Sequence, residues 1–270
     1  MFFCFKLNGA VEESAGSDVF FNLSVFFEKF NEKIHLERSD YPRPENIDSK
    51  IWEQVKSHLL PHDHVVKKKL DKLFTKKQVN KNACSLLTAG FRFSPPRTIC
   101  NPVVAFHNDL NGFLIKTFTD EQPYQNGWIQ WLARIQGAEL IREAITCKGY
   151  GEIFKVPHKW IYLIPYNCNQ GVGNFFLLVE EDMCIESYEK NRLKWKKQPT
   201  KKTLYALYDL LENLGLLDSV YVFNIPYAKD GKIAFIDTEH SLKWMVPYRK
   251  LNKALSDENL HYWMTITKQN

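Results

Sequence analysis

Residues 218–240, DSVYVFNIPYAKDGKIAFIDTEH, contain two runs of β-forming residues on either side of the pair Asp230-Gly231. An Asp-Gly pair between two such runs is a strong β-hairpin signal, because both residues tolerate the positive φ angles of a tight turn. A hairpin here brings the side chain of Asn224 beside Asp237, thirteen positions later. An amide oxygen and a carboxylate at one strand end suit a hard cation such as Mg²⁺. The alternative is a surface hairpin with polar ends.

The composition is that of a globular protein with a well-filled core. Of the 270 residues, 44% are hydrophobic and 25% are charged, which is ordinary for soluble globular proteins. A chain of this length suits one large domain or two unequal lobes. The net charge of +5 is far below that of a dedicated nucleic-acid-binding protein, so nucleic acid is not the favoured partner.

The cysteines and the apolar runs indicate in which cellular compartment the protein is expected. The six cysteines are scattered and include no Cys-x-x-Cys pair, which favours free thiols in a reducing compartment over disulfides or a zinc site. The apolar runs at residues 1–5 and 19–27 are too short or too interrupted to cross a bilayer. We therefore expect a cytoplasmic protein without a transmembrane segment.

Residues 1–95 are expected to form an N-terminal helical extension. Residues 18–36 and 51–60 carry apolar side chains at helical spacing. Residues 67–81 place seven lysines around an apolar stripe, which predicts a basic amphipathic helix. This helix and a second basic cluster around Trp195 could bind an anionic membrane or stack a nucleic-acid base, although a solvated lysine face is commoner.

A second hairpin is predicted in the middle of the chain. Residues 103–106 and 113–118 are strand-like runs, separated by a turn that ends at Gly112. Lys116 stands inside the second run, after three apolar residues. A lysine at such a position usually extends its charge past the sheet edge to water. It can alternatively reach into a cleft and contact a phosphate.

Residues 128–145 give the clearest helix. At 100° per residue, their tryptophans and aliphatic residues share one face, and Glu139 projects near the middle of that apolar stripe. A carboxylate there is costly to bury unless it is paired. The two candidate partners are Arg142, one turn later, and Lys116 on the preceding strand.

The rest of the chain alternates strands and helices, which predicts an α+β fold. Residues 158–164 and 175–179 are strand-like, and the second run is followed by the acidic stretch Glu180-Glu181-Asp182. Residues 203–214 form a helix with a leucine stripe, and Gly215 stands at the position of a helix C-cap.

Taken in order, these elements resemble a protein kinase in a reduced and divergent form, over roughly residues 100–250. Phe113-Leu114-Ile115-Lys116 is similar to the kinase strand that carries the nucleotide lysine. Asn224 resembles the catalytic-loop asparagine, and Asp237-Thr238-Glu239 stands where Asp-Phe-Gly is expected. The resemblance implies a two-lobed fold. It would have an antiparallel-sheet N-lobe at residues 96–182 and a reduced helical C-lobe at residues 183–270.

The resemblance also implies ATP and Mg²⁺ as cofactors and assigns roles to six residues. Lys116 would contact the α- and β-phosphates and would be held by Glu139. Asp218 would orient the acceptor hydroxyl. The metal would be held by the residues that match the kinase metal positions and by one adjacent carboxylate, namely Asn224, Asp237 and Glu239.

The chain also departs from the kinase pattern. No Gly-x-Gly-x-x-Gly loop precedes the lysine strand, and there is no His-Arg-Asp or Ala-Pro-Glu motif. Asp218 lies six positions before Asn224, where the pattern has five. We expect an ATP- and Mg²⁺-dependent phosphotransferase whose acceptor is unknown. The alternatives are an inactive pseudokinase or protein-interaction module, and a binder of nucleic acid or membrane through the basic surface.

Overall fold

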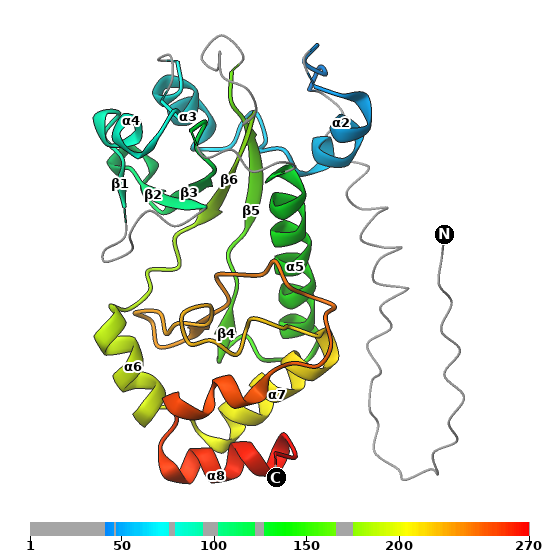
Figure 1. Cartoon of the computed structure of the whole chain (residues 1–270), viewed down its shortest axis with the longest axis vertical. Coiled ribbons are helices and arrows are strands. Elements are labelled where there is room, and N and C mark those ends of the chain that lie inside the picture. Colours follow the sequence, from blue (N-terminus) through cyan, green and yellow to red (C-terminus); the bar gives the residue numbers. More distant parts are fainter. Residues whose placement is uncertain are drawn as a thin grey trace, which may run out of the picture.

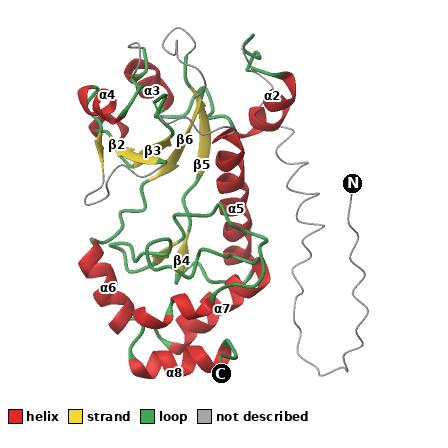
Figure 2. Ribbon diagram, in the orientation of Figure 1, coloured by secondary structure: helices red, strands yellow, loops and turns green. Residues whose placement is uncertain are grey.

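The computed structural model has a mixed α+β architecture, with a small antiparallel sheet at one end and packed helices at the other (Figures 1 and 2). The predicted α+β class is therefore confirmed. The structure describes residues 41–45, 47–75, 79–93, 102–121, 127–165 and 175–269. The helix expected at residues 18–36 lies outside the described residues.

The main sheet has five strands in the order β1-β2-β3-β6-β5, and every neighbouring pair is antiparallel. The strands are β1 (Arg92–Phe93), β2 (Val103–Phe106), β3 (Phe113–Thr117), β5 (Lys159–Leu163) and β6 (Phe176–Glu181). The predicted hairpin of β2 and β3 is confirmed, with Val103 opposite Thr117. β6 follows β5 in the chain but inserts between β3 and β5, so it becomes a central strand.

Each face of this sheet has its own hydrophobic core, because side chains alternate along a strand. Ile115 and Val179 point to the face covered by α3 (Lys67–Leu73) and α4 (Ala83–Thr88). Ile161 and Leu178 point to the other face, against helices that flank it from two parts of the chain. These are α2 (Ser49–Val55), which a 3₁₀ turn at Lys56–His58 extends, and α5 (Gly127–Cys147) (Figure 1).

The described part of the expected N-terminal extension, which begins at residue 41, is packed onto this sheet. α3 and α4 bury their apolar residues in the same core as the sheet, and β1 at Arg92–Phe93 pairs with β2. A domain boundary at residue 95 would therefore separate strand β1 from strand β2, with which it pairs.

Helix α5 joins the two ends of the molecule. Its first half packs on the sheet through Trp131 and Ile135, and its second half packs in the helical end through Ile141 and Ala144. Because the helix is covered on several sides, its buried residues do not form the single stripe that the sequence predicts. The buried charged residue of α5 is Arg134, whereas the Glu139 side chain is 33% exposed.

The helical end contains α6 (Tyr188–Lys197), α7 (Lys201–Leu214) and α8 (Asp257–Ile266), with short 3₁₀ turns at Tyr248–Lys250 and Asn252–Ala254. A parallel pair of short strands, β4 (Phe154–Lys155) and β7 (Ile233–Ala234), completes this end. The predicted helix ending at Gly215 is confirmed. Gly215 has φ +54°, the left-handed conformation of a glycine C-cap.

The basic run around Trp195 is helix α6 and not an exposed connector. The Trp195 side chain is fully buried, and its indole nitrogen donates to the Ile225 carbonyl oxygen at 3.2 Å. Asn191, one turn earlier, is buried on the same face. The expectation that Trp195 could stack a nucleic-acid base is therefore wrong, because the ring is a core residue beneath a lysine-rich surface.

The hairpin predicted at residues 218–240 is present. Tyr227 bridges Ile233 in antiparallel fashion, and Gly231 turns the chain at φ +87°. Further along the hairpin, the Ile236 amide donates to the Asn224 carbonyl oxygen at 3.0 Å. Asn224 therefore lies beside the residue that precedes Asp237.

Candidate functional site

Six charged side chains meet where the sheet, α5 and the hairpin come together, and we call this group the buried charge cluster. It contains three cations and three carboxylates, namely Lys116, Arg134, Lys159, Glu180, Asp237 and Glu239. Of the residues expected at a functional site, Lys116, Asp237 and Glu239 belong to it.

The sheet register explains the positions of Lys116, Lys159 and Glu180. Lys159 on β5 lies directly opposite Glu180 on β6, and Lys116 on β3 is diagonal to Glu180 on the same face. The Lys116 Nζ lies 2.9 Å from Glu180 Oε1, and the Lys159 Nζ lies 3.3 Å from Glu180 Oε2. Both lysines also donate to the Ile236 carbonyl oxygen, at 3.0 and 3.1 Å. The lysines therefore connect the sheet to the hairpin strand that leads into Asp237.

Arg134 connects the hairpin to α5. One terminal nitrogen of its guanidinium contacts Asp237 and the other contacts Glu239. Between these residues, the Thr238 hydroxyl donates to the Arg134 carbonyl oxygen and accepts from the Lys159 Nζ at 3.0 Å. The segment Asp237-Thr238-Glu239 is thus held on the helix by backbone and side-chain contacts.

Gly137 allows this segment to approach the helix closely. A Cβ atom built at Gly137 would lie 2.0 Å from the Thr238 carbonyl oxygen and 3.2 Å from the Ser241 Oγ. No side chain fits in that space, so the sequence needs a glycine one turn after Arg134 on α5.

The cluster is charge-balanced. Burial alone would raise the pKa of Glu180, but Lys116 and Lys159 more than offset it, so the pKa lies below its usual value. Asp237 behaves in the same way, because Arg134 and the two lysines outweigh its burial. Burial lowers the pKa of Lys159 to about 8, although Glu180 partly counteracts this effect. Near neutral pH, three positive charges therefore face three negative ones.

Glu139 lies outside the cluster. Its carboxylate pairs with Arg142, whose other terminal nitrogen donates to the Pro157 carbonyl oxygen at 2.9 Å. The expected pairing of Lys116 with Glu139 is therefore corrected: Lys116 pairs with Glu180. The physical reason is the sheet order, because β6 lies directly beside β3 and brings Glu180 to the lysine.

Asp218 and Asn224 lie next to the cluster and contact each other. The Asn224 Nδ2 donates to the Asp218 carbonyl oxygen at 3.0 Å. The Asp218 carboxylate contacts the His240 Nδ1, and both side chains are about one-third exposed. The Leu217 amide donates to the His240 carbonyl oxygen at 3.0 Å, which fixes the backbone of this pair.

Four contributors were not identified from the sequence: Arg134, Lys159, Glu180 and His240. Lys159 had a usable signal, because it is a charged residue inside a strand-like apolar run and therefore needs a partner if it is buried. Glu180 begins an acidic stretch after such a run, so the sequence alone does not distinguish it from the exposed acids that follow. Arg134 had no comparable signal, since a single arginine on a long helix is usually solvated.

The donor set suits a magnesium ion. Asp237 and Glu239 already share one cation, the Arg134 guanidinium, so their oxygens converge. Asn224 lies on the opposite arm of the hairpin, and its side-chain amide nitrogen donates to the Asp218 carbonyl oxygen at 3.0 Å. Among the described residues, no group of three His, Cys, Asp or Glu side chains could hold a metal. Mg²⁺ typically uses one or two carboxylates together with waters and substrate phosphates.

A cavity of about 340 Å³ borders this site. It lies between α5 and residues 239–243, and its walls include Gln136, Leu140, Glu239 and Leu242. Glu239 therefore contacts Arg134 and also borders open space.

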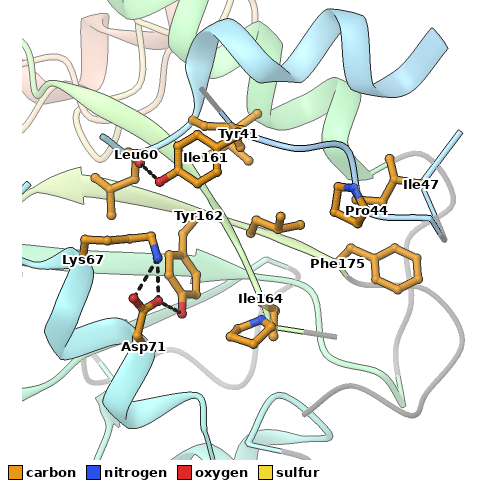
Figure 3. A pocket seen from close by; sticks show the side chains of 13 residues that line it. Tyr41, Pro44, Ile47, Leu60, Lys67, Asp71, Ile161, Tyr162, Ile164 and Phe175 are labelled. Carbon is orange, nitrogen blue, oxygen red and sulfur yellow. Dashed lines mark hydrogen bonds and ion pairs between the residues drawn. The ribbon is translucent and has the colours of Figure 1, made fainter. Parts of the chain in front are cut away.

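A second cavity, of about 210 Å³, lies at the edge of β5 (Figure 3). Its walls are mostly apolar, and its charged end is an ion pair of Lys67 and Asp71 at 2.7 Å. The Tyr162 hydroxyl donates to the same Asp71 carboxylate at 2.9 Å. The charged groups at this end are therefore already paired with one another.

No family model, curated protein or solved structure matches this chain. Within the described residues, no helix has the length and apolar character needed to cross a membrane. The function of this chain is therefore inferred from the geometry of its own residues.

Proposed function

We propose that the chain is a divergent, two-lobed protein-kinase-like phosphotransferase that uses ATP and Mg²⁺. One observation carries the proposal: Lys116 is held in a buried ion pair with Glu180, and its Nζ also donates to the Ile236 carbonyl oxygen, immediately before Asp237. A strand lysine, a carboxylate that holds it and a metal-side aspartate are the parts that a kinase brings together around a nucleotide.

The order of elements supports the same proposal. A hairpin carrying Lys116 is followed by α5, the short strand β4, two further strands of the main sheet and a connection to the helical end. A turn-rich segment from Asp218 to Asn224 then leads into the hairpin that ends at Asp237. The sheet would form the N-lobe and α6 to α8 the reduced C-lobe.

In this proposal the residues act mainly by positioning and electrostatics. Lys116 would contact the α- and β-phosphates, and Glu180 takes the role that the kinase pattern gives to Glu139. Asp237, Glu239 and Asn224 would hold Mg²⁺, which when bound neutralises charge on the phosphates. Asp218, oriented by His240, would direct the acceptor hydroxyl.

A second candidate is a nucleotide-binding pseudokinase that acts through protein interactions. This candidate is favoured because the acidic side chains of the site already contact basic residues of the same chain. Arg134 contacts Asp237 and Glu239, and His240 contacts Asp218. A protein in which these contacts are permanent would bind a nucleotide without transferring its phosphate.

The test measures the thermal stability of the full chain with ATP and Mg²⁺, together with transfer of the γ-phosphate. A ligand at about 100 times its Kd stabilises the folded state by about 2.7 kcal/mol, which raises the melting temperature measurably. We expect wild type to show both a shift and transfer, and Lys116→Met and Asp237→Asn to lose transfer. Leu193→Ala, which changes an exposed side chain on α6, is the control.

The possible outcomes separate the candidates. A thermal shift without transfer supports the pseudokinase. If ATP and Mg²⁺ do not change the melting temperature of the wild type, both nucleotide-binding candidates are contradicted. If Asp237→Asn transfers the γ-phosphate as well as the wild type does, the assignment of Asp237 as a magnesium-binding residue is contradicted.

A further inference from the structure

Arg134 occupies the place in the buried charge cluster that the proposed function gives to a divalent cation. Its side chain is 6% exposed, and its two terminal nitrogens contact Asp237 and Glu239 separately. A planar guanidinium offers two donors at a fixed spacing, so it can engage two carboxylates at once. The carboxylates that would bind the metal are therefore already neutralised by a residue of the same chain.

Three independent contacts keep the carboxylates on α5. The first is the guanidinium itself, and the second is the Thr238 hydroxyl, which donates to the Arg134 carbonyl oxygen. The third is the close approach at Gly137, where a Cβ atom would lie 2.0 Å from the Thr238 carbonyl oxygen. Residues 237–239 and this part of α5 therefore form one unit.

A divalent cation bound to Asp237 and Glu239 would lie close to the Arg134 guanidinium, which contacts one oxygen of each carboxylate. Like charges at such a short distance repel each other. Lys116 and Lys159 also lie close to Asp237 and lower its pKa together with Arg134. A divalent ion entering with Arg134 in place would add two positive charges to a group that is already balanced and only partly open to water, since the Asp237 side chain is 36% exposed and that of Arg134 6%. Uncompensated charge is costly in such a place. Arg134 must therefore leave before the ion binds.

The surroundings leave room for such a change. Glu239 borders the 340 Å³ cavity between α5 and residues 239–243, so its carboxylate has space to move away from the guanidinium. The chain beyond it contains Leu242 and Met245 at φ +57° and +65°, conformations that non-glycine residues seldom adopt. Such strained backbone is often found in segments that switch conformation.

We propose that Arg134 is an autoinhibitory latch, which holds Asp237 and Glu239 in an arrangement that excludes a divalent cation until it is released. This inference rests on the proposed function, because it takes Asp237 and Glu239 as the metal-side carboxylates. Arg134 acts here as a positioning residue, with no assigned part in the chemical step.

The test is Mn²⁺ binding to the full chain without nucleotide, measured from the paramagnetic signal of the free ion. A site that is open in about a tenth of the molecules binds roughly tenfold more weakly than a site that is always open. We therefore expect Arg134→Gln to bind Mn²⁺ at least about tenfold more tightly than wild type. Asp237→Asn in the Arg134→Gln background should abolish the gain.

Arg142→Gln is the matched control. Arg142 is an arginine of the same helix that also pairs with a carboxylate, but its partner is Glu139, outside the cluster. It should leave Mn²⁺ affinity at the wild-type value. Arg134→Lys keeps the charge but offers a single donor group, so an intermediate affinity is expected, and this variant serves if Arg134→Gln does not fold.

The results distinguish this inference from the proposed function. Equal Mn²⁺ affinity in wild type and the folded Arg134 variants overturns the latch, even if ATP with Mg²⁺ still stabilises the wild type. Tighter Mn²⁺ binding in Arg134→Gln supports the latch, and a lack of stabilisation by ATP and Mg²⁺ would then overturn nucleotide use alone.

Discussion

Lys116 on β3 forms a buried ion pair with Glu180 on β6, the neighbouring strand of the sheet, at 2.9 Å. Lys159 reaches the same carboxylate from the strand on the other side of β6. Glu180 therefore holds two lysines from two strands, and both lysines also bind the Ile236 carbonyl oxygen before Asp237. This arrangement makes Glu180 the residue on which the geometry of the site depends.

Removing Lys116 should destabilise the fold. Lys116→Met leaves Glu180 buried with only Lys159 as a partner, and breaking a buried pair costs about 3 kcal/mol or more. Urea denaturation measures the loss. Glu139→Gln, which alters a half-exposed pair on α5, should cost about 1 kcal/mol or less. Equal stability of the two variants would contradict the central role of the Lys116–Glu180 pair.

Gly137→Ala should be destabilising even though alanine favours a helix more than glycine does. The new Cβ atom would meet the Thr238 carbonyl oxygen at 2.0 Å, and overpacking of this kind costs about 1–3 kcal/mol. Gly151→Ala is the control, because nothing lies within 4 Å of its Cβ position. Denaturation curves for both variants check this, and a neutral Gly137→Ala would show that the segment does not pack closely on α5.

Stability should depend on pH through Lys159. Burial lowers its pKa in the folded state to about 8, below about 10.4 in the unfolded chain. Between these values the unfolded state binds more protons, so the free energy of unfolding rises with pH by up to about 1.4 kcal/mol per unit. The measurement compares wild type with Lys159→Met between about pH 7 and 9.5. A constant difference across that range would contradict a neutral Lys159 at high pH.

Trp195 should contribute to stability rather than to nucleic-acid binding. Trp195→Ala removes a fully buried indole and should cost about 3–5 kcal/mol. Trp244→Ala removes an indole that is half exposed and donates to the Glu212 carbonyl oxygen, so it should cost about 1 kcal/mol. Thermal denaturation of both proteins gives the comparison, and a Trp195→Ala protein as stable as wild type would refute the burial.

Local patterns were sufficient to predict several elements. The two hairpins followed from turn residues, with Gly112 in one and Gly231 in the other, both at positive φ. Helix α7 followed from its leucine spacing and from Gly215. The interactions that decide each of these elements lie within a few residues of one another in the chain.

The partners within the charge cluster could not be predicted in the same way. Lys116 and Glu180 are neighbours only because β6 inserts between β3 and β5, and strand order is a property of the whole sheet. Arg134 meets Asp237 across 103 positions of sequence. Helix α6 was missed for a different reason, because its lysines conceal a buried face that consists mainly of Trp195.

The most direct test is the affinity of the full chain for ATP with Mg²⁺, measured by calorimetry for wild type, Glu180→Gln and Glu139→Gln. Because Glu180 positions Lys116, we expect Glu180→Gln to weaken binding by about tenfold or more, or about 1.4 kcal/mol. Glu139→Gln should bind as wild type does. The proposed site would be contradicted if the wild type did not bind ATP with Mg²⁺. It would also be contradicted if Glu139→Gln lost binding while Glu180→Gln bound as the wild type does.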